Sequence, residues 1–277
     1  MALPLQTSGE GAGRRAAAVD PVQARAYAEA TNDLNPAYLD GRYAPPVFGV
    51  VPTWDVSMET LNEVVPAEAW PGLLHAEQDM SFHRPLVPGM ALVTSADVFC
   101  VRMARSGAWV TVRIESEGAD GRPVLEQFST MFIRGLGDLV DVGPDRPGHA
   151  FPEDARDRLV AEVVRHVDDD QTFRYRDASG DTNPIHVDEA YAHEAKLPGI
   201  IVHGLCTMAM CGSVVVDEVA ARDPARLARL AVRFSRPVFP GDDLTVSVYD
   251  AGGGAYAFEA KAREKLVVRD GWAEVRS

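Results

Sequence analysis

The chain has 277 residues, of which 46% are hydrophobic and 25% charged, a composition typical of a globular protein with a substantial core. Its formal net charge is −14 and it has no run of basic residues, so neither nucleic acid nor an anionic membrane surface is an expected partner. Three cysteines (Cys100, Cys206 and Cys211) are too few for a disulfide framework and lack metal-ligand spacing, which favours free thiols in a reducing compartment.

The beginning of the chain has the composition of a loose leader, over residues 1–15. This stretch has no apolar segment long enough for a signal peptide. Nowhere does an uninterrupted apolar run approach the ~18 residues that a membrane span needs. The sequence therefore predicts a cytoplasmic protein whose ordered part begins at residue 16.

The chain repeats itself once. A shift of 148 aligns residues 19–44 with 167–192, and four extra residues at 193–196 raise the shift to 152 for the rest. FHRPLVPG at 82–89 then aligns with FSRPVFPG at 234–241. Because a single gap explains the matches, we infer two homologous halves, 16–135 and 156–277, joined by a linker rich in Gly, Asp and Pro at 136–155.

Each predicted half contains the same elements in the same order. Asp20 and Pro21 are typical of a helix start, with an N-cap residue followed by proline at the first helical position. A polar Asn-Pro loop follows, and then an apolar segment of helical length, at 50–65 in the first half and 203–220 in the second. The small and apolar residues of GLCTMAMCGSVVV predict a helix that is buried nearly all round.

Strands are expected after each buried helix. The Pro- and Gly-containing turns are followed by extended runs, which pair as antiparallel neighbours. These runs lie at 91–99, 108–116 and 124–134 in the first half and at 243–251, 255–268 and 272–276 in the second. The predicted fold is α+β, with two repeats that each wrap an antiparallel sheet around a long central helix.

The loop SGDTNPIHVD at 179–188 places Asp181 and His186 around a turn. Proline fixes the turn and the Asn183 side chain can hydrogen-bond to its own backbone, so the acid and the imidazole can converge. Gly204 opens the predicted buried helix, where unpaired N–H groups and the positive end of the helix dipole point outward. Its lack of a side chain would let a ligand approach the backbone closely.

The loop SGDTNPIHVD, followed by PGIIVHG, resembles the signature of the MaoC-like, R-specific enoyl-CoA hydratase (hydratase 2) family. The repeat resembles the double-hot-dog members of that family, and PPVFGVVP at 45–52 is similar to their degenerate N-terminal half. The resemblance implies the hot-dog fold and reversible syn addition of water to trans-2-enoyl thioesters, giving R-3-hydroxyacyl thioesters. It implies no metal or other cofactor.

By motif position, the resemblance implies that Asp181 and His186 are the catalytic pair and that the Gly204 N–H binds the thioester oxygen. A carboxylate and a neutral imidazole that hold one water can perform the acid–base work of hydration. The predicted substrate-binding residues are Asn183, His203, Trp54 and Met58. For the last three, local packing is the competing explanation. The expected substrate is an acyl-CoA; attachment to acyl carrier protein stays open, as does a homodimer.

The first half lacks the corresponding chemistry. Tyr38 occupies the position of His186, and a phenol with an ordinary pKa of about 10 is no substitute for an imidazole base. Pro52 occupies the position of Gly204 and has no N–H to offer. Asn32 replaces Gly180, which suggests a different turn. We therefore expect one active site per chain.

Two alternatives remain at this stage. A hot-dog acyl-thioesterase would release thiol from a saturated acyl-CoA, although the GDxNPxH loop is not typical of such enzymes. A non-catalytic acyl-thioester-binding protein would not add water to crotonyl-CoA.

Overall fold

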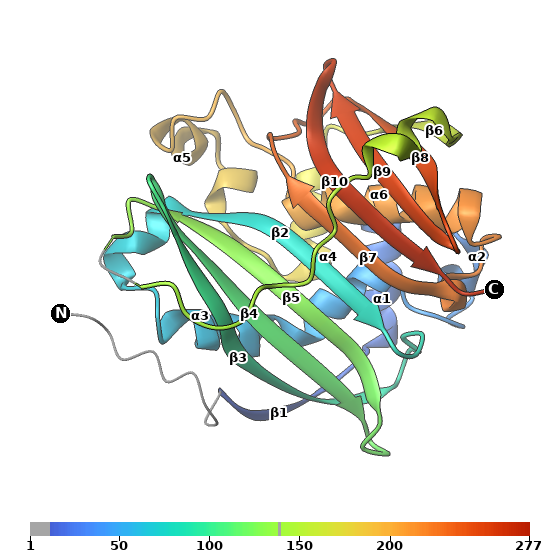
Figure 1. The fold of residues 1–277 in the computed structure, drawn as a ribbon, viewed down its shortest axis with the longest axis horizontal. Helices are drawn as coiled ribbons and strands as arrows, with labels where there is room; N and C mark the ends of the chain where they lie inside the picture. Colours follow the sequence, from blue (N-terminus) through green and yellow to red (C-terminus); the bar gives the residue numbers. More distant parts are fainter. Residues whose placement is uncertain (1–11, 138–139) are drawn as a thin grey trace.

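The computed structural model describes residues 12–137 and 140–277. Ten antiparallel strands form one sheet with the order β1-β3-β4-β5-β2-β7-β10-β9-β8-β6 (Figure 1). The strands are β1 (Ala12–Ala18), β2 (Leu73–Phe82), β3 (Ala91–Ala104), β4 (Gly107–Gly118), β5 (Pro123–Arg134), β6 (Leu159–His166), β7 (Leu227–Phe234), β8 (Asp243–Gly252), β9 (Ala255–Ala262) and β10 (Lys265–Val275). Each half of the chain supplies five neighbouring strands, and the halves meet where β2 pairs with β7.

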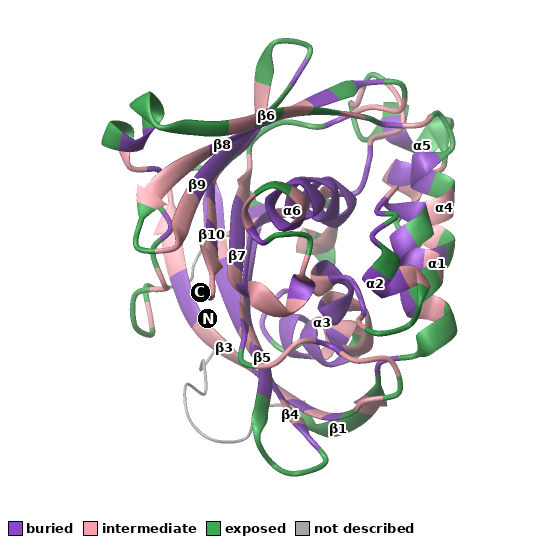
Figure 2. Ribbon diagram, turned by 90° about the vertical axis from the view of Figure 1, so that its right-hand side faces the viewer, coloured by how far each residue is buried: buried purple, intermediate pink, exposed green. Residues whose placement is uncertain are grey.

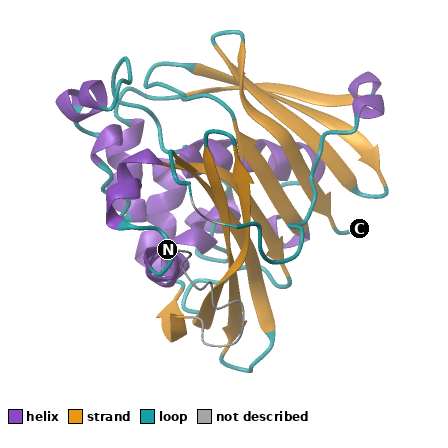
Figure 3. Cartoon of the chain, turned by 60° about the vertical axis from the view of Figure 1, so that its left-hand side comes forward, coloured by secondary structure: helices purple, strands orange, loops and turns teal. Residues whose placement is uncertain are grey.

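The α-helices lie on one side of the sheet, as Figure 3 shows. In Figure 2, α3 and α6 lie between the sheet and an outer layer that contains α1 and α4. The α-helices are α1 (Pro21–Ala30), α2 (Pro36–Leu39), α3 (Trp54–Asn62), α4 (Gln171–Ser179), α5 (Glu189–Glu194) and α6 (Gly204–Val219). The 3-10 helices are η1 (Pro46–Thr53), η2 (Ala67–Gly72), η3 (Glu153–Asp157), η4 (Pro184–His186) and η5 (Pro224–Arg226). Among the described residues, no helix combines the length and the apolar character that crossing a membrane would require.

The two central helices differ in length. The predicted helix at 203–220 is confirmed as α6, and all of its residues from Leu205 to Val216 are buried. The helix expected at 50–65 is wrong in its first part, because residues 46–53 form η1 and α3 begins only at Trp54. Pro52 gives the physical reason, since proline in an α-helix interior removes one hydrogen bond and clashes with the carbonyl four residues earlier.

The pairing of β2 with β7 is symmetric. Under the repeat shift of 152, Asp79 corresponds to Ala231, and these two residues are direct partners in the ladder. On either side of them, Glu77 pairs with Arg233 and Ser81 pairs with Arg229. The same shift relates Glu77 to Arg229 and Ser81 to Arg233, so the two pairs are equivalent. Each half therefore presents the same strand to the other, as in the self-complementary interface of a twofold-symmetric dimer.

The outer helices repeat this symmetry. The Gln23 side chain donates to the Ala178 carbonyl at 3.1 Å, and the corresponding Gln171 donates to the Ala30 carbonyl. The hydroxyl groups of Tyr27 and Tyr175, which are 148 residues apart, lie 3.2 Å from each other. Helices α1 and α4 thus meet about the same approximate twofold axis as β2 and β7.

The start of the chain differs from the sequence expectation. Residues 12–15, expected in the loose leader, belong to β1, which pairs with β3 and forms an edge strand of the sheet. The rest of the leader lies outside the described residues. The linker crosses the face of the sheet opposite the helices (Figure 1). The boundaries 16–135 and 156–277 stay a prediction for independently folding units.

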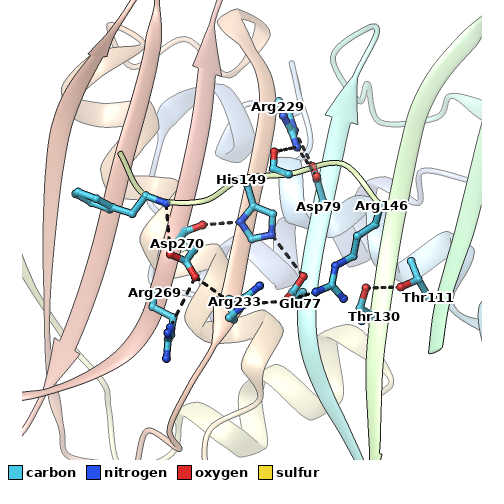
Figure 4. A network of polar contacts seen from close by, with 12 residues as sticks. Glu77, Asp79, Thr111, Thr130, Arg146, His149, Arg229, Arg233, Arg269 and Asp270 are labelled. Atoms are coloured by element: carbon cyan, nitrogen blue, oxygen red, sulfur yellow. Dashed lines mark hydrogen bonds and ion pairs between the residues drawn. The ribbon is translucent and has the colours of Figure 1, made fainter. Parts of the chain in front are cut away.

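The linker covers charged groups of the β2–β7 seam (Figure 4). The Glu77 carboxylate is 4% exposed and accepts from Arg233 at 2.6 Å and from Arg146 of the linker at 3.1 Å. Asp79 is paired with Arg229 through two hydrogen bonds of 3.0 and 2.6 Å. Charges as buried as these require close partners, because an unpaired one has lost its hydration without compensation.

We therefore expect Asp79→Ala to lower the free energy of unfolding by roughly 3–5 kcal/mol, since it leaves the largely buried Arg229 guanidinium with only the half-exposed Glu274 carboxylate, at 3.4 Å. Asp120→Ala is the matched control. It breaks the Arg84–Asp120 pair, whose carboxylate is 46% exposed, and should change stability by less than about 1 kcal/mol. Urea denaturation followed by circular dichroism measures both. Equal destabilisation by the two substitutions would contradict the importance of the seam.

Candidate active site

The loop between α4 and η4 is shaped by its own side chains. Gly180 ends α4 in the left-handed conformation, with φ of 81°, which glycine adopts without steric penalty. The Asp181 carboxylate accepts from the Asn183 N–H at 3.1 Å, and the Asn183 side chain accepts from the Ile185 N–H at 3.3 Å. These local hydrogen bonds reverse the chain between Asp181 and His186, as the Asn-Pro motif predicts.

His186 is held in one tautomer. Its Nδ1 lies 2.8 Å from the carbonyl oxygen of Ile201, and a carbonyl can only accept, so Nδ1 carries a proton. Burial lowers the pKa of His186 below the ordinary imidazole value. The ring is therefore neutral near pH 7, and its Nε2 offers a lone pair as a proton acceptor.

His203 lies directly behind this ring. The two imidazoles stack with centroids 3.8 Å apart, and the ring of Tyr175 packs against His203 at 4.7 Å. The Nε2–H of His203 donates to the backbone carbonyl of Asp181 at 3.2 Å. Burial, together with the neighbouring His186, lowers the pKa of His203 to about 3. His203 is only 1% exposed and so has almost no surface for a ligand. It is suited to positioning Asp181 and His186.

The ligand atoms of Asp181, His186 and His203 lie within 4.8 Å of one another. This grouping raises the question of a metal ion. Two of the four imidazole nitrogens already have partners, since His186 Nδ1 donates to Ile201 and His203 Nε2 donates to the Asp181 carbonyl. A water that bridges Asp181 and His186 also fits within the limit of 4.8 Å, because two hydrogen bonds of about 2.8 Å span roughly 4.5 Å.

Gly204 provides an N–H group beside the pair. It is the first residue of α6 and follows His203 directly, so its N–H has no partner within the helix and lies at the positive end of the dipole. A Cβ atom at Gly204 would lie 3.4 Å from the ring of Phe234. A side chain here would thus fill the space between the helix start and that ring.

The remaining predicted residues are not all at one place. Asn183 is exposed, and its side-chain oxygen is used by the turn. Trp54 packs against the large apolar cluster that contains α6, whereas Met58 packs against a separate cluster within the first half. Both are half-buried. Their substrate-binding role stays a prediction.

The corresponding loop of the first half has the same turn but a different environment. Asn32 adopts φ of 55°, close to the 81° of Gly180, so the expectation of a different turn is wrong. Asparagine tolerates this conformation better than most residues. Burial raises the pKa of Asp33 to about 7. Tyr38 is buried, and its hydroxyl lacks a partner among the described residues.

Two residues near the pair could not be found by motif. The ring of Phe234 at the end of β7 packs edge-on against the ring of His75 at the start of β2, with centroids 5.4 Å apart. His75 lies close enough to Asp181 for its charge to act on the His75 pKa, which burial lowers to about 4. The repeat could have pointed to His75, because the equivalent position of the second half is occupied by a leucine, Leu227.

Comparisons with known proteins identify the family of the chain. Residues 151–270 match the MaoC-like domain, and residues 6–127 match the FAS1-like dehydratase domain region. The chain is 31% identical over 212 residues to 3-hydroxyacyl-thioester dehydratase Y of Mycobacterium tuberculosis, covering 73% of this chain and 72% of that protein. It is 26% identical over 226 residues to the probable enoyl-CoA hydratase 2 of Dictyostelium discoideum, covering 80% and 76%.

A solved structure shows the same fold. The MaoC-like dehydratase from Phytophthora capsici superposes with a TM-score of 0.89 at 24% identity, over 99% of this chain and 97% of that one. A Mycobacterium tuberculosis protein with a double hotdog fold superposes with a TM-score of 0.56 at 15% identity, over 94% of this chain and 92% of that one. These two structures confirm the expected α+β double-hot-dog fold, and the relatives confirm the family resemblance. The chain belongs to the MaoC-like dehydratase family.

Proposed function

We propose that the protein adds water to trans-2-enoyl thioesters to give R-3-hydroxyacyl thioesters, and catalyses the reverse dehydration. The observation that carries this proposal is the convergence of the Asp181 carboxylate and the neutral His186 within 4.8 Å, close enough to hold one water between them, beside the start of α6. The names of the relatives, a dehydratase of hydroxyacyl thioesters and an enoyl-CoA hydratase, support the same reaction.

In the hydration direction, the water oxygen attacks C3 of the enoyl group. His186 Nε2 removes one proton from the water, because its lone pair is free while Nδ1–H is held by Ile201. Asp181 accepts the other hydrogen of the water and stabilises the imidazolium that forms. Positioned acid–base groups of this kind typically contribute about 10²–10⁴-fold in rate.

The electron pair of the C2=C3 bond moves toward the thioester, so that negative charge develops on the carbonyl oxygen. The Gly204 N–H at the start of α6 is the proposed donor to that oxygen, and loss of such a donor typically costs about 10²–10³-fold. The imidazolium of His186 then returns its proton to C2. One water is added, and the neutral imidazole is restored.

Thioester hydrolysis is the less favoured alternative. It requires water over the carbonyl carbon, whereas in the proposed binding mode the carbonyl oxygen lies at the Gly204 N–H and the pair lies beside the adjacent C2 and C3. We infer CoA as the carrier, because enoyl-CoA hydratases are among the relatives. We propose that the acyl chain lies between the two halves. A cytoplasmic location and a homodimer are further proposals.

The direct test is hydration of crotonyl-CoA followed at the enoyl absorbance, with determination of the product's configuration. Asp181→Asn and His186→Ala should each reduce kcat by roughly 10²–10⁴-fold while leaving the fold intact. The double variant should lose little more than either single one, because the two side chains act on one water.

Asp33→Asn, the same substitution at the equivalent position of the first half, is the matched control and should keep full activity. Turnover of folded Asp181→Asn at the wild-type rate would overturn the assignment.

The pH dependence follows from the tautomer of His186. Hydration requires the neutral form of His186. Because burial lowers the pKa of His186, its ring becomes protonated in the free enzyme only at a more acidic pH than an ordinary imidazole. We expect kcat/KM to stay level as the pH falls through about 6.5 and to decline only below it. Initial rates in overlapping buffers, with circular dichroism at each pH, measure this. A decline centred above that value would contradict a buried, neutral base.

The degenerate half should not be revived by a histidine alone. We expect Tyr38→His, made in an Asp181→Asn background that silences the native site, to restore less than about tenfold in hydration. Pro52 still offers no N–H, which forfeits about 3–4 kcal/mol of transition-state stabilisation. The pKa of about 7 also leaves Asp33 partly protonated. Recovery well beyond tenfold in kcat would show that Pro52 is not the barrier.

A further inference from the structure

A chain of polar side chains runs through the interior of the first half. Nε2 of His75 lies 3.1 Å from Oε1 of Gln78, whose amide donates to Gln127 at 3.1 Å, and Gln127 donates to the Thr53 hydroxyl at 2.9 Å. Ser129 adds a contact of 3.4 Å to His75. Gln78, Gln127 and Thr53 are at most 1% exposed. Burial of so many polar groups needs a reason, because it rarely stabilises a core more than apolar packing does.

The fold itself does not require these polar residues. At the equivalent positions of the second half, Leu227 stands for His75 and Leu230 for Gln78. Ala273 pairs with Leu230 as Ser129 pairs with Gln78. Both leucines are buried. The same strands with the same bulge thus pack well with apolar residues, and the polar set is specific to the half that lacks the acid–base pair.

The polar chain ends at the candidate active site. His75, at the end of the polar chain, is half-exposed, and its ring packs on the ring of Phe234. Phe234 in turn lies against Gly204. The charge of Asp181 acts on His75 as well. An acyl chain that extends from a thioester at Gly204 toward the first half would therefore pass Phe234 and meet His75.

We propose that the acyl group taken by this site carries a hydroxyl group beyond C4, and that His75 is the residue that hydrogen-bonds to it. This inference rests on the proposed function. Gln78 Oε1 accepts from the Nε2–H of His75, because an amide oxygen cannot donate, and Nδ1 therefore keeps a lone pair that can accept from a hydroxyl. A carboxylate is disfavoured, because burial keeps His75 uncharged and Asp181 is a nearby anion. A purely aliphatic chain would cover the Nδ1 lone pair without giving it a hydrogen-bond partner.

The test is a substrate panel on the wild-type enzyme. It contains crotonyl-CoA, trans-2-octenoyl-CoA and the isomers of the latter with a hydroxyl at each carbon beyond C4 in turn. We expect at least one hydroxylated isomer to exceed octenoyl-CoA by about tenfold or more in kcat/KM. Crotonyl-CoA is too short to reach His75, so its hydration tests the proposed function alone. Hydration of crotonyl- and octenoyl-CoA without preference for any hydroxylated isomer would overturn this inference and leave the proposed function standing.

A substitution borrowed from the second half identifies the residue. His75→Leu should bring the ratio of kcat/KM for the preferred isomer and for octenoyl-CoA down to about one. His83→Leu, the same change at an exposed histidine just beyond the end of β2, should keep the wild-type ratio. An unchanged ratio in folded His75→Leu would remove His75 from the proposal. If that variant fails to fold, His75→Gln, which keeps a partner for Gln78, replaces it, and the wild-type panel decides the substrate class in either case.

Discussion

Antiparallel pairing of β2 with β7 about Asp79 and Ala231 places the start of each strand beside the end of the other. Consequently Phe234, at the end of β7, meets His75 near the start of β2. The start of α6, against which Phe234 lies, is brought to the same place. The candidate site is therefore composite. Its acid–base pair comes from the second half, and the surface facing it comes from the first.

The same symmetry creates a second end of the seam, where the first half would place its own chemistry. There Asp33 and Tyr38 keep the turn but not the function. One residue explains much of the difference, because Pro52 both removes the N–H of a helix start and prevents α3 from beginning where α6 begins. Loss of the donor and shortening of the helix are thus two results of the same substitution.

The sequence was most informative where structure is determined locally. The turn around Asp181 and His186 depends on Gly180, Asn183 and a proline within ten residues, and α6 is marked by its uniformly small and apolar surface. Strands β3, β4, β5 and β8 were also predicted. The hairpin expected between 255–268 and 272–276 is wrong in its turn, which lies at Arg263 and Glu264, so that residues 265–268 belong to β10 and not to β9. The seam strand β2 was missed, because LLHAEQDMSF has no apolar alternation: Glu77 and Asp79 face arginines, while His75 and Gln78 face the interior. The arginines that pair with these carboxylates are 150 or more residues away in the chain, so a local sequence pattern cannot reveal the pairs.

The two parts of the composite site are held by separate sets of contacts. His186 is fixed by Ile201 and by the stacked ring of His203, all within the second half. His75 is fixed by Gln78 and Ser129, both within the first half. None of the hydrogen bonds that fix His186 comes from His75 or from the partners of His75. A substitution of His75 therefore leaves those hydrogen bonds intact, and it reaches the second half through the packing of the ring on Phe234. In this duplicated fold, the half without the pair can change substrate recognition while the chemistry in the other half is retained.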